Sequence, residues 1–374
     1  MTMRRAFAGV VLAGALLAVA SGCGGSGASW ISGPQTATTW SWHSCDTRFE
    51  CATLSVPVSY SNPGGPHIPI AVVKLAATGP HPIGDIVFNP GGPGASGVQY
   101  LEAAAGDFPA SLRDRFTLVS FDPRGSGASK PLRCLTSAGI RAWIGVDPAP
   151  ATPRQIAGVV KASKAFVRGC ERHASKSYIA SLSTANNARD MDRLRAALGE
   201  PKLTYYGLSY GTYLGTVYAE MFPRHIRAMV LDGALDPSLG VTTSEAQQAA
   251  GFETDLHDFF SWCRSNCGNG FSTKTAQKYA ALMNGFRRGR VISGYGRPVD
   301  YGVALIGVVA TLYSKDTWPF LAQALAAAEN GDGSDLVDAA YSYAGANRDG
   351  SFSNILSANM ATNCLDRPGP TTLP

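Results

Sequence analysis

The stretch at 203–212, Leu-Thr-Tyr-Tyr-Gly-Leu-Ser-Tyr-Gly-Thr, constrains the fold of this chain more than any other. A β-forming run leads directly into Gly-Leu-Ser-Tyr-Gly, and apolar residues then recur at helical spacing as far as Met221. The pattern predicts a strand that turns abruptly into a helix at Ser209. A Gly-x-Ser-x-Gly sequence in that setting is typical of a nucleophile elbow, a strained turn that lifts a serine hydroxyl above the sheet at the positive end of the helix. A chance match in a chain with 42 glycines would not bring a strand before it and a helix after it.

The composition indicates one large globular domain with an insertion. The chain has 374 residues, of which 45% are hydrophobic and 16% are charged, so it can bury a large core. The formal net charge is +5, and no cluster of lysines and arginines stands out. We therefore expect a protein that binds neither nucleic acid nor an anionic membrane surface. We also expect a monomer.

Residues 1–22 predict an export signal, because two arginines precede an apolar run and a set of small residues. The apolar run is too short to span a membrane comfortably. Ala-Ser-Gly-Cys resembles a bacterial lipobox, with Ala where Leu is usual, and this favours Cys23 as a lipidated first residue and the only membrane attachment. The alternative is plain secretion with cleavage after Ala20. The Gly-, Ser- and Thr-rich segment 23–41 then predicts a flexible tether. In both cases the protein is exported, either as a cell-envelope lipoprotein or as a secreted protein.

Export makes disulfides an expected feature of the chain. Apart from Cys23, close spacing and one longer excursion suggest the pairs Cys45 with Cys51, Cys263 with Cys267, and Cys134 with Cys170. Cys364 is left over. No second pair and no histidine couple follow Cys263 and Cys267 at ligand spacing, so we expect no metal.

The order of predicted elements favours an α/β fold. Val- and Ile-rich segments predict early strands at 51–60 and 68–75, then strands at 85–88 and 116–122 with a helix between these two, and further on helices at 148–172 and 184–198 and a strand at 225–232. Strand, helix, strand is typical of a right-handed crossover. We therefore expect a mostly parallel sheet with helices on both faces.

A glycine-rich turn at 89–97 allows two interpretations. Its Gly92, Gly94 and Gly97 satisfy the dinucleotide pattern G-x-G-x-x-G, and Asp122 ends the next strand where such a fold keeps its ribose-binding acid. An exported protein, however, has no supply of a nicotinamide cofactor, and a proline at 93 restricts the turn.

The second interpretation of that turn is an oxyanion hole. Backbone N–H groups of Gly92, with Gly91 as a close second, and of Tyr210 would face a substrate carbonyl. Glycine suits this task because the carbonyl must approach the bare backbone. We favour the oxyanion hole because it also explains Ser209, and we expect no cofactor.

Charged residues between the glycine-rich turn and the elbow are expected to be structural. Arg124 is predicted to brace the floor of the site through hydrogen bonds. Asp190, Asp192 and Arg193 are expected to be solvated or capping charges on the helix at 184–198.

Five motifs together resemble the secreted tripeptidyl-aminopeptidase-like branch of the α/β-hydrolases, which is related to prolyl aminopeptidases. They are Asn-Pro-Gly-Gly-Pro-Gly at 89–94, Asp-Pro-Arg-Gly-Ser-Gly at 122–127, Ala-Arg-Asp-Met-Asp-Arg-Leu-Arg at 188–195, Gly-Leu-Ser-Tyr-Gly-Thr-Tyr-Leu-Gly at 207–215 and Val-Leu-Asp-Gly-Ala-Leu-Asp-Pro at 230–237. The resemblance implies an α/β-hydrolase core at 42–237. It also implies a serine peptidase that releases short peptides from N-termini, with Ser209 as the nucleophile that forms an acyl-enzyme and Gly92 and Tyr210 as oxyanion donors.

The resemblance further implies a helical cap insertion at 238–350. Amphipathic helices are predicted at 245–263, 275–286, 318–328 and 334–343. A cap excludes water and restricts entry to narrow peptide ends. Its expected lining residues are Trp262, Tyr313 and Trp318, and an acid for the ammonium group of the substrate is available at Glu245, Glu253, Asp255 and Asp258.

The general base is hard to find in this sequence. In an α/β-hydrolase the acid and the histidine follow the serine, on loops that leave later strands. Beyond Asp232 no Val- or Ile-rich run predicts such a strand. His225 precedes its strand and is expected at the opposite edge of the sheet from Ser209, and His257 falls in a cap helix. Asp232 ends a strand beside the elbow, where we expect a structural hydrogen-bonding role.

The region 351–374 looks like the start of an incomplete C-terminal region. Asn-Cys-Leu-Asp at 363–366 resembles a family motif at the end of the cap, and the resemblance implies that Cys364 pairs within a later portion. The last strands of an α/β-hydrolase sheet are therefore not among the strands that we predict for this sequence. The strand at 226–231 would consequently leave an unpaired, apolar sheet edge.

Two classes of function follow. The first is a serine peptidase, active or inactive according to whether the acid and the histidine are supplied. The second is a non-catalytic envelope protein that binds peptides in the same pocket. An esterase or lipase is a third possibility, because the elbow alone does not fix the acyl group.

Overall fold

The computed structural model describes residues 40–374 apart from 269–270, 292, 294–295, 368 and 370–374. The predicted export signal, Cys23 and nearly all of the predicted tether lie outside the described residues. In the described part the predicted α/β fold is confirmed.

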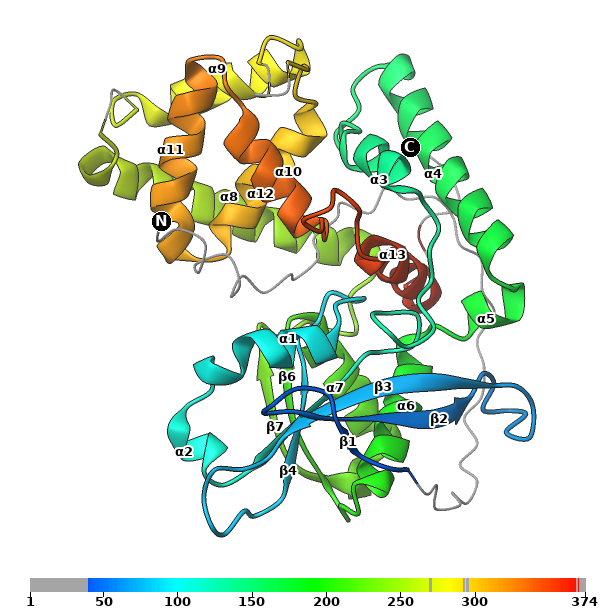
Figure 1. The fold of residues 1–374 in the computed structure, drawn as a ribbon. Coiled ribbons are helices and arrows are strands. Elements are labelled where there is room, and N and C mark those ends of the chain that lie inside the picture. Colours follow the sequence, from blue (N-terminus) through cyan, green and yellow to red (C-terminus); the bar gives the residue numbers. More distant parts are fainter. Residues whose placement is uncertain (1–39, 269–270, 292, 294–295, 368, 370–374) are drawn as a thin grey trace.

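A seven-stranded sheet forms the base of the molecule (Figure 1), in the order β1-β2-β3-β5-β4-β6-β7. The strands are β1 (His43–Ser44), β2 (Glu50–Pro57), β3 (His67–Leu75), β4 (Asp85–Asn89), β5 (Thr117–Phe121), β6 (Leu203–Leu208) and β7 (Ile226–Asp232). The first three strands pair antiparallel, and β3 is antiparallel to β5. The strands β5, β4, β6 and β7 are parallel, so their carboxyl ends meet at one edge of the sheet.

Helices cover both faces of this sheet. One face packs under α1 (Gly97–Ala104) and α2 (Ala110–Arg113), and the other under α6 (Thr184–Ala197) and α7 (Tyr210–Met221). Side chains of a strand alternate between the faces, so Phe88 of β4 joins one apolar cluster and its neighbour Val87 joins the other. Because both faces of β4 are buried, the middle of its sequence is a continuous apolar run without polar alternation.

A second group of helices lies beyond one end of the sheet (Figure 1). It consists of α3 (Ser137–Ile144), α4 (Pro153–His173), α5 (Lys176–Ala180), α8 (Val241–Asn266), α9 (Thr275–Arg287), α10 (Tyr301–Leu312), α11 (Trp318–Glu329), α12 (Ser334–Tyr343) and α13 (Ile355–Asp366). Short 3-10 helices are η2 (Ala105–Asp107), η3 (Pro223–His225) and η4 (Lys315–Thr317). The helices predicted within the cap are present as α8, α9, α11 and α12.

Helices α3, α5, α10 and α13 were not predicted. In α10 eight of the 12 residues are buried, so it is apolar on most sides and lacks an amphipathic period. Gly307 lets it approach α12 closely, because a Cβ there would lie 2.3 Å from the carbonyl oxygen of Leu336. In α13 the buried face is partly polar and includes Ser357, Asn359 and Thr362, so no apolar pattern marks it.

The three predicted disulfides are confirmed. They join Cys45 to Cys51, Cys134 to Cys170 and Cys263 to Cys267. Cys364 lies in α13 and takes part in none of these three. No helix of the described residues combines the length and the apolarity that crossing a membrane requires.

The strand β7 forms an open edge of the sheet, as predicted. It pairs with β6 on one side and has no strand on its other side among the described residues. Its side chains are half-buried or exposed, and Val230 is 58% exposed. The edge therefore presents both apolar side chains and unpaired backbone groups.

The expectation that Asp190 and Asp192 are solvated or capping charges is wrong. They are only 1% and 2% exposed, because α6 is packed on different sides and each carboxylate meets partners from another part of the chain. Asp190 binds Arg124, and Asp192 binds Arg195 and His225. Burying a carboxylate is costly unless cations or hydrogen-bond donors compensate it, as they do here.

Candidate active site

Ser209 lies between the end of β6 and the start of α7, in the backbone conformation φ 52°, ψ −121°. A positive φ is uncommon for a residue with a side chain. It costs conformational energy, which contacts with the surrounding structure must offset. The Ser209 N–H donates to the Asp232 carbonyl oxygen at 2.9 Å, and the Ser209 carbonyl oxygen accepts from the Thr212 N–H at 2.8 Å. The Thr212 hydroxyl donates to the same carbonyl at 2.6 Å. The predicted strand, sharp turn and helix at Ser209 are therefore present.

The two glycines of the elbow are required by close backbone contacts. A Cβ on Gly207 would lie 2.4 Å from the Gly211 carbonyl oxygen, and a Cβ on Gly211 would lie 2.5 Å from the Asn89 carbonyl oxygen. Real Cβ atoms do not come this close to other heavy atoms, so both positions require glycine. The elbow is thus wedged against the end of β4.

The glycine-rich turn touches the elbow directly. A Cβ on Gly91 would lie 3.2 Å from the Cβ of Ser209. The Gly91 N–H donates to Asn89 Oδ1 at 2.9 Å, so it already has an acceptor within the loop. The next backbone N–H along the loop belongs to Gly92. Tyr210 is the first residue of α7, and an N–H at that position has no intrahelical acceptor. Both sequence-predicted amides therefore lie on segments that adjoin Ser209.

The surroundings of Asp122 do not fit the role of a ribose-binding acid. It is 1% exposed, and it accepts from the Ser96 hydroxyl at 2.6 Å, the Val98 N–H at 3.1 Å and the Ala128 N–H at 2.7 Å. Burial raises the pKa of the Asp122 carboxyl. Because the carboxyl fastens the start of α1 to the turn after β5, it is not available to a dinucleotide.

Arg124 has the structural hydrogen-bonding role that the sequence predicts. Its guanidinium is buried and donates to both carboxylate oxygens of Asp190 at 2.6 Å. It also donates to the carbonyl oxygens of Pro57 and Val58, each at 3.1 Å. One side chain thus ties the end of β2 to α6 through a bidentate ion pair.

A polar chain that the sequence did not reveal begins at the side chain of Tyr210. The Tyr210 hydroxyl is hydrogen-bonded to the Thr184 hydroxyl, and Thr184 Oγ1 donates to Asp366 Oδ2 at 2.5 Å. Asp366 Oδ1 accepts from the Thr184 N–H at 2.9 Å. Burial raises the pKa of Asp366 to about 6, although the Thr184 hydrogen bonds lower it. No local pattern predicts this chain, because Thr184 and Asp366 are 182 positions apart.

Among the four predicted cap acids, Glu245 lies beside a contact with α7. It is half-buried at the start of α8, and burial raises its pKa while Arg367 lowers it. Arg367 donates to the neighbouring Ser244 hydroxyl at 2.9 Å and lies 4.7 Å above the ring of Tyr213, one helical turn after Ser209. Of the other acids, Glu253 and Asp258 are exposed and Asp255 is half-buried.

The predicted aromatic lining of the cap is wrong for Trp318. This residue is 3% exposed and packs edge-on against Phe259 and Trp262 in the interior of the helical group. Tyr313 stacks on Tyr343. Aromatic residues at helical spacing here serve the core.

None of the six histidines of the described residues is placed to act on Ser209. His225 precedes β7 and lies at the far end of the sheet, roughly 20 Å away for a strand of this length. Its Nδ1 contacts Asp192 Oδ1 at 2.7 Å. His257 is exposed on α8 and contacts Glu253 at 3.2 Å. The other four are exposed, on β1, on β3, on the loop before β4 and at the end of α4: His43, His67, His81 and His173.

Asp232 has the hydrogen-bonding role that the sequence predicts. Its carbonyl oxygen accepts from the Ser209 N–H, and its carboxylate accepts from the Tyr206 hydroxyl at 3.2 Å.

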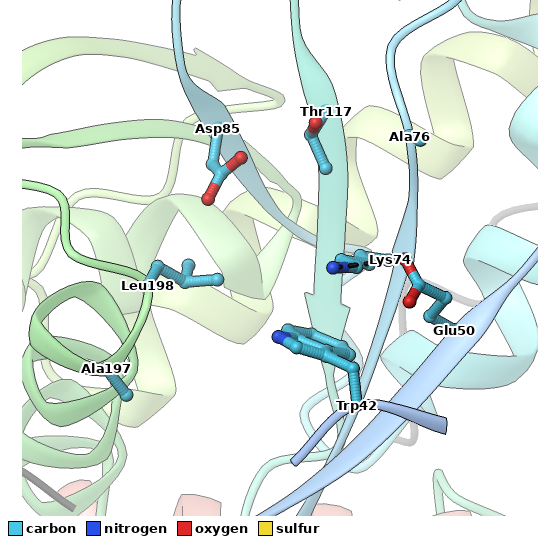
Figure 2. A pocket seen from close by; sticks show the side chains of 8 residues that line it. All are labelled: Trp42, Glu50, Lys74, Ala76, Asp85, Thr117, Ala197 and Leu198. Carbon is cyan, nitrogen blue, oxygen red and sulfur yellow. Dashed lines mark ion pairs between the residues drawn. The ribbon is translucent and has the colours of Figure 1, made fainter. Parts of the chain in front are cut away.

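Figure 2 shows the side chains that line a small hollow. It has a volume of about 190 Å³ and is lined by Trp42, Glu50, Lys74, Ala76, Asp85, Thr117, Ala197 and Leu198. Lys74 pairs with Glu50 at 3.1 Å and lies 4.2 Å above the Trp42 ring. Asp85 and Thr117 begin β4 and β5, whereas Ser209 follows the carboxyl end of the parallel strand β6. The hollow is therefore separate from the elbow.

Comparisons with known proteins agree with this geometry. Residues 86–284 match the family described as alpha/beta hydrolase fold. The chain is 36% identical over 337 residues to serine protease Hip1 of Mycobacterium tuberculosis, covering 86% of this chain and 64% of that protein. It is 37% identical over 355 residues to carboxylesterase B of the same species, covering 90% and 68%. It is 35% identical over 223 residues to tripeptidyl aminopeptidase of Streptomyces lividans, covering 58% and 41%. The chain thus spans a little under two-thirds of the length of Hip1.

Proposed function

Because the chain belongs to the alpha/beta hydrolase fold family, we propose that it is a serine peptidase that releases short peptides from the N-termini of polypeptides. The observation that carries this proposal is the strained conformation of Ser209, between β6 and α7 and against the loop of Gly91 and Gly92. Strain of this kind at a strand-to-helix turn is typical of a displayed nucleophile.

In the proposed reaction Ser209 Oγ attacks the scissile carbonyl carbon. The N–H groups of Gly92 and Tyr210 donate to the oxygen that becomes negative, and each such donor contributes about 10²- to 10³-fold to turnover. The C–N bond then breaks, the proton of the serine hydroxyl leaves with the new amine, and an ester on Ser209 remains. Water hydrolyses this acyl-enzyme and restores the hydroxyl.

The proton transfer needs a general base, and no histidine of the described residues lies at Ser209. Loss of a triad member lowers turnover by about 10⁴- to 10⁶-fold. We therefore propose that Ser209 reacts slowly with the described residues alone and quickly only when an imidazole is supplied beside it.

The acid that binds the substrate ammonium group is proposed to be Glu245. It is the predicted cap acid that is partly buried and interacts electrostatically with Arg367, whose guanidinium lies over the Tyr213 ring, and these features support this role. A half-buried carboxylate recognises a free N-terminus and rejects an N-acylated one, because the acylated end carries no positive charge.

Hydrolysis of carboxylic esters is a second candidate function. Carboxylesterase B matches 90% of this chain, whereas Hip1 matches 86%. The elbow itself does not distinguish an amide from an ester. A peptide-binding protein without catalysis is the remaining alternative.

Competition between substrates tests these functions. Peptide amides with free N-termini, the same peptides N-acetylated, and short-chain esters are offered to the wild-type protein, Ser209→Ala and Glu245→Gln. The proposal expects release from free N-termini to exceed release from acetylated ones, to vanish in Ser209→Ala and to show a raised KM in Glu245→Gln. Turnover of esters alone would instead identify an esterase, and binding of peptides without turnover a binding protein.

We also propose that the protein is exported. Three disulfides support this, because they persist in oxidising compartments. A lipid on Cys23 would anchor it to a membrane. Detergent phase partition of the wild-type protein and Cys23→Ser tests the anchor, since only a lipidated protein moves into the detergent phase, and equal partition of the two would exclude it.

A further inference from the structure

The helix α13 contacts both halves of the proposed oxyanion hole. In Figure 1 it lies between the sheet and the helices α8 to α12. Its first turn meets the glycine-rich loop, and its last residue meets the chain that leads to Tyr210.

On the loop side the contact is made by Asn359. Its Nδ2 donates to the Pro93 carbonyl oxygen at 3.2 Å, and its side chain is 2% exposed. The other end of the amide is fixed too, because Asn359 Oδ1 accepts from Asn363 Nδ2 at 3.1 Å. The backbone of Gly94 packs so tightly on α13 that a Cβ there would lie 2.6 Å from the Ile355 carbonyl oxygen. The residue that follows Gly92 is thus held by a buried hydrogen bond.

On the elbow side the contact is made by Asp366. Its two oxygens accept from the N–H and the hydroxyl of Thr184. Since Thr184 Oγ1 uses its only proton in this bond, the Tyr210 hydroxyl must donate to Thr184. The side chain of Tyr210 is 4% exposed, so the chain of bonds runs through the interior, where it is strong and has no competing water. The residue whose N–H faces the substrate is therefore anchored at the far end of its side chain.

We propose that Asn359 and Asp366 are positioning residues that fix the separation of the Gly92 and Tyr210 amides through α13. The inference rests on the proposed function, because the separation matters only where both amides bind one oxyanion. Catalytic donors lose effect steeply when they move, since about 1 Å of misplacement lowers a rate by about 100-fold.

The alternative is that α13 only stabilises the fold. Thr362 supplies a matched control, because it is 3% exposed on the same helix and its hydroxyl donates to the Leu182 carbonyl oxygen at 3.2 Å. This bond belongs to neither of the two contacts with the oxyanion hole. Thr362→Val thus weakens the attachment of α13 without touching Pro93 or Tyr210.

The experiment compares three variants with the wild-type protein. In Asp366→Asn the amide oxygen still accepts from the Thr184 N–H, and the bonds among the amide nitrogen, Thr184 and Tyr210 can reverse their direction. In Asp366→Leu the anchor is lost. The first readout is the second-order rate of Ser209 modification by a fluorophosphonate, and the second is amide hydrogen exchange of peptides that cover 89–97 and 203–214.

We expect Asp366→Leu to lower the modification rate at least about tenfold and to speed exchange at 203–214. Asp366→Asn should keep most of the rate, and Thr362→Val should keep both the rate and the exchange pattern while lowering the melting temperature. Equal rates and exchange in Asp366→Leu and wild type, or equal losses in Asp366→Leu and Thr362→Val, would overturn the inference. If the wild-type protein is not modified at all, the proposed function fails, and the exchange data still decide whether Asp366 anchors Tyr210.

Discussion

At Ser209 a residue with a side chain adopts a positive φ, and the glycines around it provide the space. Gly91 has the same need, because its φ is +93° and a Cβ would lie 2.6 Å from the Leu208 carbonyl oxygen. We predict that Gly91→Ala lowers the free energy of unfolding by about 1 to 3 kcal/mol and displaces the loop from Ser209.

Urea denaturation measures this effect of Gly91→Ala. Gly106→Ala is the control, because Gly106 is exposed and a Cβ there meets nothing within 4 Å. The control should unfold at the same denaturant concentration as the wild-type protein or slightly above it. Equal stability of the two variants would mean that the loop does not press on the elbow.

Asp366 predicts a dependence of stability on pH. Burial raises its pKa to about 6 in the folded chain, above the ordinary aspartate value of 3.8. Between about pH 4 and pH 6 the folded state therefore binds more protons at this group than the unfolded state, and its contribution to stability falls as pH rises. The difference in unfolding free energy between wild type and Asp366→Asn should change across this window.

The difference curve is needed because Asp85 has the same property. Burial and the neighbouring Glu200 raise its pKa to about 6, and it remains in both proteins. Subtraction removes its contribution. Urea denaturation at several pH values gives the curve, and a flat difference between pH 4 and pH 6 would show that Asp366 does not titrate there.

The elements show where sequence patterns succeed and fail. The strand at 203–208 and the helix after it were predicted because β-formers, two glycines and a helical period follow one another locally. Helices α10 and α13 were missed because one is apolar on most sides and the other buries polar residues. A helical period of hydrophobic residues appears only when a helix has a buried apolar face and an exposed polar face, and neither helix has this contrast.

The edge strand β7 predicts self-association. Val230 is 58% exposed beside unpaired backbone groups, an arrangement that invites another strand. We predict that the described chain associates with rising concentration and that Val230→Lys reduces this association, because a lysine on an edge strand disfavours pairing. Sedimentation velocity over a range of concentrations measures the effect.

Val167→Lys is the matched control for this edge. Val167 is 49% exposed on α4, where the backbone groups are satisfied within the helix. Its replacement should leave association unchanged. Equal behaviour of both variants would assign the association to general apolar exposure and not to the strand edge.

At the scale of the whole molecule, the sequence predicted the sheet, the elbow and the disulfides but not the links between distant segments. The glycine loop and the elbow each have a local pattern, whereas Asn359, Thr184 and Asp366 act through contacts between segments far apart in the chain. Folding alone brings α13 to both halves of the proposed hole. The burial of Asp190 was missed for the same reason, since its partner Arg124 lies 66 positions away.

The central claim is that Ser209 is a nucleophile displayed toward the amides of Gly92 and Tyr210. Treatment of the folded protein with a fluorophosphonate, followed by mass spectrometry of the intact chain and its peptides, tests it most directly. We predict a single adduct on Ser209 that is absent in Ser209→Ala. Its rate should keep rising from about pH 6 to about pH 9, because the described residues place no imidazole at Ser209 to produce a plateau. An adduct on another serine, or no adduct on a chain that circular dichroism shows to be folded, would contradict the account.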